Sequence, residues 1–436
     1  MSIREHIKKQ YSTEFFKYSA ALLSSNALAQ IIGFLVYPVI TRLYNPEIFG
    51  VFNFLLSIVG ILTLLTTGRY ELAIVLPKSE KKAVALFQLS LLLTGCITLF
   101  FFVVAGIFGK NIAILFHQER LIPLLPYLPA YLLLWGLWQT LNYYFVRQKK
   151  YYNISFYNVT QSIVNSGMKC FFGFKAFLSL GLVWGQLLGQ FIATAISAIS
   201  GRSFFKCLNQ WDKKEIIAVA KAYSNFPKFY LPYGLVNLAA ANLPILLLPF
   251  CFDMENFGQK FGLFTFAFTV GFVPVTFFSN SICQVMFRQM SERVQNKGEL
   301  KSDCLKFCKM CLLFILPFFI FFVFIPDNFF GSLFGQRWIN VGFYLKLLLP
   351  CIFLSILVGS LSFIPDLFFK QKTVLHIEMI YIVLKAISLL LGVYLQSFDL
   401  AIIFHSIVVT CVLMIKLIWY FKLIKEYELS NKKQIA

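Results

Sequence analysis

Hydrogen-bonding side chains recur along one face of an apolar segment, residues 154–175. This polar stripe consists of Asn158, Gln161, Asn165 and Lys169. Steps of three and four residues place these side chains on one side of an α-helix. Amide and ammonium groups suit a ligand that is rich in hydroxyl groups and negatively charged. The stripe is therefore a candidate wall of a substrate cavity.

The next apolar segment, residues 178–200, offers a second explanation for the polar stripe. It carries Gln186 and Gln190, and it has glycines four residues apart at Gly181, Gly185 and Gly189. Small residues let two membrane helices approach closely, so that amides hydrogen-bond across the contact. Polar groups inside a membrane are costly unless they face a cavity or bind a partner. The sequence leaves the cavity and the helix contact open.

A second constellation lies in the segment 373–395. Glu378 and Lys385 are seven residues apart with Tyr381 between them, so that all three share one helix face. The two charges are predicted to form an internal ion pair or to contact a ligand. Lys385 is near the expected middle of the membrane, and either role requires it to face the interior of the protein.

Two further candidates lie near the N-terminus. Arg69 and Glu71 are expected at the end of the segment 47–70, on different sides of the helix because they are two residues apart. Arg69 either contacts the cavity or extends to the inner headgroups. Asn26 and Gln30, four residues apart, are expected to line the cavity or to bind the second helix.

The sequence contains no pattern that requires a cofactor or a metal ion. Cys304, Cys308 and Cys311 share a helix face, which favours packing in the core over metal binding. The nucleotide-binding pattern GxxxxGK[ST] is absent. The longest connections expected outside the cell, near 108–120 and 327–339, have no room for a catalytic domain. The chain is predicted not to be an enzyme.

Composition assigns the chain to the membrane. Its 436 residues are 59% hydrophobic and 13% charged, whereas soluble domains contain about 25% charged residues. Apolar runs close to the ~20 residues needed to cross a bilayer fill the whole length, and in lipid they must be helical. The predicted fold is therefore all-α with about twelve transmembrane helices. The spans are 15–41, 47–70, 83–107, 121–145, 154–175, 178–200, 229–252, 258–287, 304–326, 340–364, 373–395 and 398–421.

The net charge of +20 has a topological explanation. Of the 39 Lys and Arg, 29 fall in segments that are cytoplasmic if the N-terminus is inside, and six fall in outer segments. This asymmetry is typical of an inner or plasma membrane protein with both termini in the cytoplasm. It argues against a nucleic-acid partner, because the basic residues follow the alternation of the spans.

The chain is predicted to have two halves. A six-helix lobe, 1–200, is followed by a cytoplasmic amphipathic linker, 201–228, and by a second six-helix lobe, 229–436. The strings FGVFNF (49–54) and FGLFTF (261–266) open the second span of each half, which indicates duplication. An even number of spans per half gives parallel repeats related by an axis along the membrane normal.

Several stretches carry a resemblance to a known family. Residues 25–79 contain TRLY, then NPEIFG, then RYELAIVLP before a basic turn. The later stretches are NYYFVRQKKY (142–151), AYSNFPKFYLP (222–232) and FGQRWINVGFYLKLLLP (334–350). With these motifs the chain resembles Wzx-type polysaccharide flippases of the multidrug/oligosaccharidyl-lipid/polysaccharide exporter superfamily.

The resemblance implies two six-helix lobes around a central cavity. It implies a multi-pass protein of the bacterial inner membrane that moves polyprenyl-diphosphate-linked oligosaccharides to the outer leaflet by alternating access. Such cargo supplies O-antigen, lipopolysaccharide or another surface polysaccharide. The implied partners are the lipid-linked glycan, membrane lipid, an H⁺ or Na⁺ gradient and a polysaccharide polymerase.

Three alternatives remain open at this point. A lipid II flippase would also carry a diphosphate, and a drug or cation antiporter of the same superfamily would need an acidic group inside the membrane. The excess of cations over acids within the spans favours an anionic cargo. A membrane glycosyltransferase or polymerase is disfavoured by the short outer connections.

Overall fold

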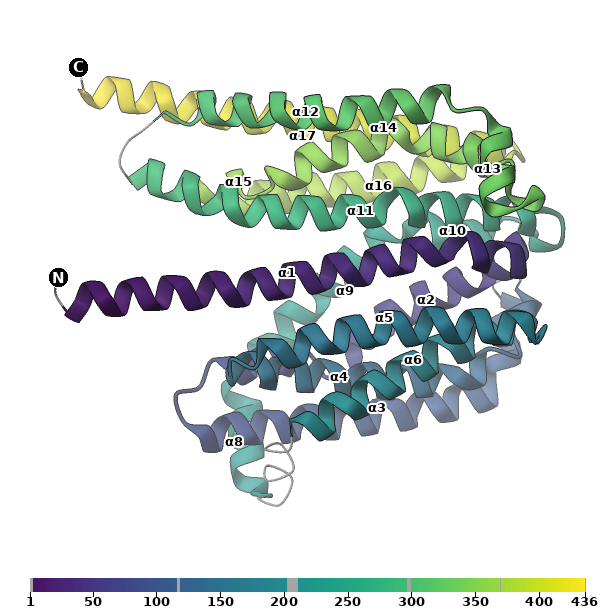
Figure 1. The fold of residues 1–436 in the computed structure, drawn as a ribbon, viewed down its shortest axis with the longest axis horizontal. Coiled ribbons are helices and arrows are strands. Elements are labelled where there is room, and N and C mark those ends of the chain that lie inside the picture. The colour runs from purple at the N-terminus through teal and green to yellow at the C-terminus, as the bar shows by residue number, and fades with distance from the viewer. Residues whose placement is uncertain (1–2, 116–117, 202–210, 296–298, 369, 436) are drawn as a thin grey trace. The chain divides into compact units, whose positions relative to one another are not determined.

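The structure is a computed structural model that describes residues 3–115, 118–201, 211–295, 299–368 and 370–435. Within these ranges every regular element is a helix (Figure 1). The chain divides into two compact units, Met1–Phe250 and Cys251–Ala436, and each is described by itself. The predicted all-α class is confirmed.

In the first unit, α5 packs along both α1 and α6, and α3 packs along α4. A left-handed turn and a short 3₁₀ helix, Tyr70–Val75, connect α2 to α3, and a π-helical turn, Phe226–Tyr230, precedes α9. The longer helices of this unit are α1 (Ile3–Leu43), α2 (Pro46–Thr66), α3 (Glu80–Leu115), α4 (Leu128–Arg147), α5 (Tyr151–Phe174), α6 (Leu178–Ser200), α8 (Lys213–Ala222), α9 (Leu231–Ala241) and α10 (Leu243–Cys251).

Glycines set the close contact between α5 and α6. A Cβ atom on Gly185 would lie 2.7 Å from the backbone nitrogen of Lys169, and one on Gly189 would lie 2.8 Å from that of Asn165. No side chain fits at such distances without moving the α5 backbone. The regular spacing of these glycines therefore lets the two helices meet backbone to backbone, as the sequence indicates.

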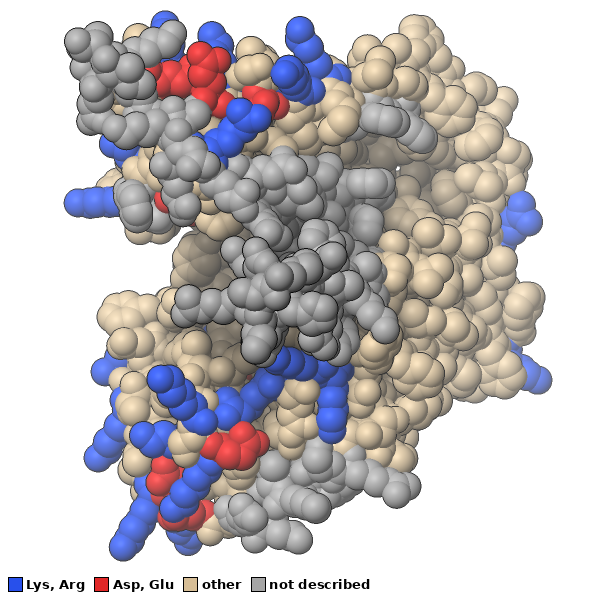
Figure 2. Space-filling view, turned by 60° about the vertical axis from the view of Figure 1, so that its left-hand side comes forward, with Lys and Arg blue, Asp and Glu red and all other residues tan. Residues whose placement is uncertain are grey.

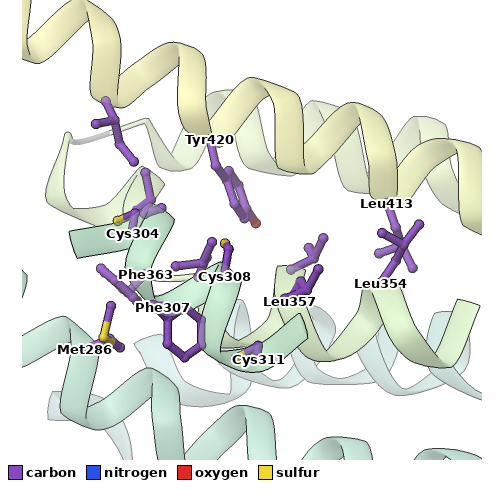
Figure 3. Close-up of a cluster of buried hydrophobic side chains, with 14 of the residues drawn as sticks. Met286, Cys304, Phe307, Cys308, Cys311, Leu354, Leu357, Phe363, Leu413 and Tyr420 are labelled. Carbon is purple, nitrogen blue, oxygen red and sulfur yellow. The ribbon is translucent and has the colours of Figure 1, made fainter. Parts of the chain in front are cut away.

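In the second unit, α14 packs against both α11 and α17, and α17 also packs along α16. The helices of this unit are α11 (Met254–Gln295), α12 (Lys301–Phe324), α13 (Asp327–Phe334), α14 (Val341–Ser360), α15 (Ile364–Leu367), α16 (Gln371–Tyr394) and α17 (Phe398–Ile435). A hydrophobic cluster joins α11, α12, α14 and α17 (Figure 3). Cys304, Cys308 and Cys311 are part of this core, beside Phe307 and Tyr420.

The helices match the predicted membrane spans. Among the described residues, seven helices are long and apolar enough to cross a membrane, or eight if α9 and α10 form one span. These two helices meet at a bend of 65°. Each of the twelve predicted spans overlaps a long helix or, for 229–252, the bent pair, although the span 121–145 begins in two 3₁₀ turns before α4. The chain is a multi-pass membrane protein.

The boundary between the compact units follows α9 and α10, which lie with the first unit because α9 packs against α2. The sequence analysis assigns residues 229–252 to the second half instead. The compact units group helices that lie close together in space. Such a grouping does not test whether the two halves arose by duplication. The division 1–200, 201–228 and 229–436 stays a prediction.

Charged residues gather where the helices end. In the first unit, Lys and Arg are dense at the end that carries α8, in the lower left of Figure 2. Asp212 caps α8 by accepting hydrogen bonds from the backbone of Lys214 and Glu215, and it lies 3.0 Å from Lys81 of α3. The hydrogen bond from Lys81 lowers the pKa of the Asp212 carboxyl. These contacts hold α8 against α3.

Candidate functional site

The polar stripe on α5 begins at its contact with α1. The amide nitrogen of Asn158 donates a hydrogen bond of 2.8 Å to Oδ1 of Asn26. One turn later, the hydroxyl of Ser162 donates to the carbonyl oxygen of Ala29 at 2.6 Å. Gln30, the other candidate on α1, is half-buried one turn beyond Asn26. Asn26 therefore hydrogen-bonds to α5. One of the two sequence-based alternatives expected it to bind the second helix.

The rest of the stripe faces α6. Oε1 of Gln186 accepts two hydrogen bonds, from the amide of Asn165 at 2.8 Å and from Nζ of Lys169 at 2.9 Å. The amide of Gln161 donates to Oε1 of Gln190 at 3.5 Å. The interhelical hydrogen bonding predicted as one explanation is thus present. The cargo-binding role of these residues stays a prediction.

Lys169 has neutral partners. Its Nζ atom lies 4.9 Å from the centre of the Phe52 ring on α2, in addition to the bond to Gln186. Among the ion pairs of the described residues, none includes Lys169. An amide and an aromatic face stabilise an ammonium group but leave its charge uncompensated. The α5–α6 contact therefore holds a lysine that has no carboxylate partner among the described residues.

Hydrogen-bonding capacity remains along the same contact. Oδ1 of Asn165 and Nε2 of Gln190 are buried and have no hydrogen-bond partner within the described structure. Most buried polar atoms in folded proteins are satisfied, so unsatisfied ones call for an explanation. A ligand that brings its own donors and acceptors would supply the missing bonds.

The expected placement of Arg69 and Glu71 was wrong. The helix α2 ends at Thr66, because Gly68 and Arg69 adopt left-handed conformations with φ of 58° and 65°. The turn brings the two side chains together in an ion pair of 3.6 Å, and Thr67 also donates a hydrogen bond to Glu71. A non-glycine residue with positive φ is strained, and such strain often marks a functional position.

The guanidinium group of Arg69 lies against α9. A Cβ atom on Gly234 would come within 2.9 Å of an Nη atom of Arg69, so the glycine makes room for it. Nε of Arg69 is buried without a hydrogen-bond partner in the described part of the chain. Arg69 is thus held between α2 and α9 by packing, with the carboxylate of Glu71 as its ionic partner.

A second charged cluster lies in the second unit, on α16 and α17. Nζ of Lys385 is 4.2 Å from the centre of the Tyr381 ring, and Nζ of Lys416 is 4.5 Å from it. Lys416 also forms an ion pair with Glu378 at 2.6 Å. Two ammonium groups therefore share one aromatic ring, and both lysines are buried. The shown partner of Glu378 is Lys416, whereas the sequence suggested Lys385.

Sequence reasoning missed Lys416 and His405. It counted Lys416 among the basic residues of the cytoplasmic C-terminal end, but α17 continues through it and buries it. The available signal was the string CVLMIKLIWYF (411–421), in which one lysine interrupts an apolar run. His405 on the same helix is 3% exposed, and its Nδ1 atom has no hydrogen-bond partner among the described residues.

Each unit therefore holds lysines inside its helix packing: Lys169 beside an amide and an aromatic ring in the first, and Lys385 and Lys416 beside Tyr381, with Glu378 paired to Lys416, in the second. Such groups suit an anion, because bringing a negative charge beside them relieves the cost of their burial. In the described residues, no group of three His, Cys, Asp or Glu is placed to hold a metal ion. The arrangement can bind and release charged cargo without a change in covalent bonds.

Several solved structures have a fold similar to that of this chain. A multidrug resistance MATE family transporter of the MOP superfamily, in an inward-facing conformation, matches with a TM-score of 0.69 at 14% identity, over 96% of this chain and 99% of that one. The lipid II flippase MurJ, in an inward closed conformation, matches with a TM-score of 0.66 at 14% identity, over 95% of this chain and 90% of that one. A mutant of the Vibrio cholerae MATE transporter VcmN has a TM-score of 0.52 at 12% identity, over 96% and 98% of the two chains.

These matches confirm the predicted fold class, an all-α polytopic membrane protein with two lobes and about twelve helices. No curated protein sequence matches the chain. The family model described as polysaccharide biosynthesis protein matches residues 39–342. Together, the family and the fold confirm the resemblance to Wzx-type flippases and indicate a flippase-type transporter. The chain belongs to the polysaccharide biosynthesis protein family.

Proposed function

We propose that the protein moves polyprenyl-diphosphate-linked oligosaccharide repeat units across the bacterial inner membrane, from the cytoplasmic to the outer leaflet, for surface polysaccharide synthesis. The observation that carries the proposal is the excess of buried cations. Lys169 contacts the Gln186 amide and the Phe52 ring, and in the second unit Lys385 and Lys416 both lie near the Tyr381 ring while Glu378 pairs with Lys416. A diphosphate would neutralise this charge during passage.

The cargo has two parts that differ in polarity. The glycan and diphosphate need a polar path, and the amides of the stripe together with the cations supply one. The polyprenyl chain is apolar and stays in lipid. Alternating access, driven by an H⁺ or Na⁺ gradient, the membrane potential or removal of the product, would move the polar part without catalysis. A polysaccharide polymerase acting on the outer leaflet would then consume the product.

Two related functions compete with this proposal. A lipid II flippase would use the same cations for a diphosphate, and its fold is similar to this one. A drug antiporter would need an acidic group that is free to bind an organic cation, but Glu378 is paired with Lys416. The buried charges thus favour a flippase for an anionic, lipid-linked cargo.

Deletion of the gene in its own host tests the proposal. We expect loss of the surface polysaccharide and accumulation of polyprenyl-diphosphate glycan in the membrane, with unchanged sensitivity to cationic drugs. Accumulation of lipid II with arrest of cell-wall synthesis would assign the lipid II cargo instead. Intact polysaccharide with raised drug sensitivity would establish an antiporter.

A further inference from the structure

A groove lined by apolar, aromatic and serine side chains opens between α1, α5 and α6, all within the first unit. Its volume is about 530 Å³, which is within the range of small-molecule sites, about 300–1,000 Å³. Among the described residues, no charged side chain lines it. Its polar residues are Ser24, Ser25, Asn153, Ser155, Ser197 and Ser200. We refer to this feature as the serine groove.

One hydroxyl at the serine groove has no hydrogen-bond partner in the described part of the chain. Ser197 is 1% exposed, and its Oγ atom is buried without a hydrogen-bond partner among the described residues. Ser25, which lines the same groove, differs because its hydroxyl donates to the carbonyl oxygen of Leu22 at 2.9 Å. An unsatisfied buried hydroxyl in a native protein requires an explanation. A ligand in the groove would provide one.

The aromatic residues of the groove narrow the class of ligand. Tyr152 and Phe156 are four residues apart on α5 and are 53% and 54% exposed. Aromatic faces stack on the C–H face of a sugar ring, while serine hydroxyls and an asparagine amide bind its hydroxyl groups. The described lining of the groove offers no cation to a diphosphate. The chemistry of the groove therefore matches a neutral sugar.

The position of the groove relates it to the polar stripe. Ser25 and Val159 line the groove, and each is next in sequence to one member of the Asn26–Asn158 pair. Lys150 precedes α5 at this end, which the basic residues predict to be cytoplasmic. A sugar bound in the groove would thus adjoin the amides that begin the stripe.

We infer that the serine groove is a binding subsite for a neutral sugar residue of the glycan, on the cytoplasmic side of the first unit. The inference rests on the proposed function, which supplies the glycan. Two parts of the cargo would then bind at different residues. The groove would bind the sugar through hydroxyls and aromatic faces, and the lysines of the proposed function would bind the diphosphate through their charge.

Thiol protection tests the inference. Ser200→Cys, in an active variant without its native cysteines, is treated in cells with N-ethylmaleimide, because Ser200 lines the groove and is exposed. One strain makes the lipid-linked glycan, and the other lacks the enzyme that attaches the first sugar to the carrier lipid. We expect several-fold slower labelling in the strain that makes the glycan. Ser90→Cys is the control, because Ser90 is buried on α3 and its hydroxyl binds the Leu86 carbonyl; it should stay inert in both strains.

Equal labelling of Ser200→Cys in the two strains would overturn the subsite. So would a lack of labelling in both, since membrane lipid or protein would then fill the groove. Leu28→Cys, on the same groove and 52% exposed, repeats the test if Ser200→Cys does not fold. Polysaccharide that persists without the gene would defeat the proposed function, whereas equal labelling in a strain whose polysaccharide needs the protein defeats only the groove.

Ser197→Ala gives an independent readout. Because Oγ of Ser197 bonds to no described residue of the protein, its removal should leave the thermal midpoint of the purified protein unchanged and should lower polysaccharide output several-fold. A lowered midpoint with unchanged output would show that the hydroxyl is structural, and it would overturn the subsite.

Discussion

Nζ of Lys416 on α17 lies 2.6 Å from Oε1 of Glu378 on α16, and the lysine side chain is 8% exposed while that of the glutamate is 46% exposed. The pair therefore has one buried and one accessible member. The buried ammonium group depends on the carboxylate and on the Tyr381 ring for compensation. Removal of either partner of such a pair leaves the other charge unpaired.

We predict that Glu378→Gln destabilises the protein by about 1–2 kcal/mol, less than for a fully buried pair because Glu378 is partly exposed. Lys416→Met should cost less, since it removes the buried charge itself. The thermal midpoint in detergent measures both. The double variant Glu378→Gln/Lys416→Met should be more stable than Glu378→Gln alone. If the two effects simply add, the pair is not coupled.

Gly185 tests the backbone contact between α5 and α6. Gly185→Ala places a Cβ atom 2.7 Å from the Lys169 nitrogen, so the helices must separate, at a cost of about 1–3 kcal/mol. The matched control is Gly167→Ala on α5, where an added Cβ meets no atom within 4 Å. We expect a lower thermal midpoint only for Gly185→Ala. Equal midpoints for the two variants would show that the helices are not in close contact.

The charge of the buried lysines is predicted to matter for transport. Lys169→Gln and Lys385→Gln should each lower polysaccharide output, because an amide hydrogen-bonds but does not attract a diphosphate. Immunoblots of the membrane fraction should show unchanged protein. Lys385→Arg should retain more output than Lys385→Gln if charge is decisive, although the planar guanidinium needs more room. Equal losses for Arg and Gln would point to shape or ion-pair geometry.

The topology follows from the distribution of basic residues. Reporter fusions at Lys150 and Lys214 should be cytoplasmic, and fusions at Lys110 and Gly335 should be outside. The two reporters used are alkaline phosphatase, which is active outside, and green fluorescent protein, which fluoresces inside. Reversed signals at two or more of these sites would reject the orientation with both termini in the cytoplasm.

The long apolar segments predicted the helices well, because in lipid a backbone must satisfy its own hydrogen bonds. The glycines of α6 also indicated the close contact with α5, since only small residues allow it. The ends of helices were harder to predict. Helix periodicity placed Arg69 inside a helix, but Gly68 and Arg69 turn left-handed and end it at Thr66. Local apolar character gave no sign of this turn.

The sequence pattern also did not predict which charged side chains form ion pairs with one another. Periodicity compares positions on one helix, so it related Glu378 to Lys385 on the same face. The ion pair instead crosses to Lys416 on α17, and such a contact depends on how helices pack. The sequence shows Lys416 as a single lysine within the apolar run 411–421. It was nevertheless counted with the basic residues of the cytoplasmic C-terminal end. The serine groove combines three helices and has no linear motif.

The most direct test of the central claim is transbilayer movement of the cargo itself. Polyprenyl-diphosphate glycan from the deletion strain is reconstituted into vesicles with or without the purified protein, and a lectin or a membrane-impermeant periodate reagent detects the outward-facing glycan. Without the protein, we predict that about half of the lipid-linked glycan stays accessible to the external reagent. With the protein, the accessible fraction should exceed half and approach the whole, because the protein moves glycan from the inner leaflet to the outer leaflet as the reagent consumes it there. Equal accessible fractions in both preparations, with protein that is folded and inserted, would contradict the proposed flippase.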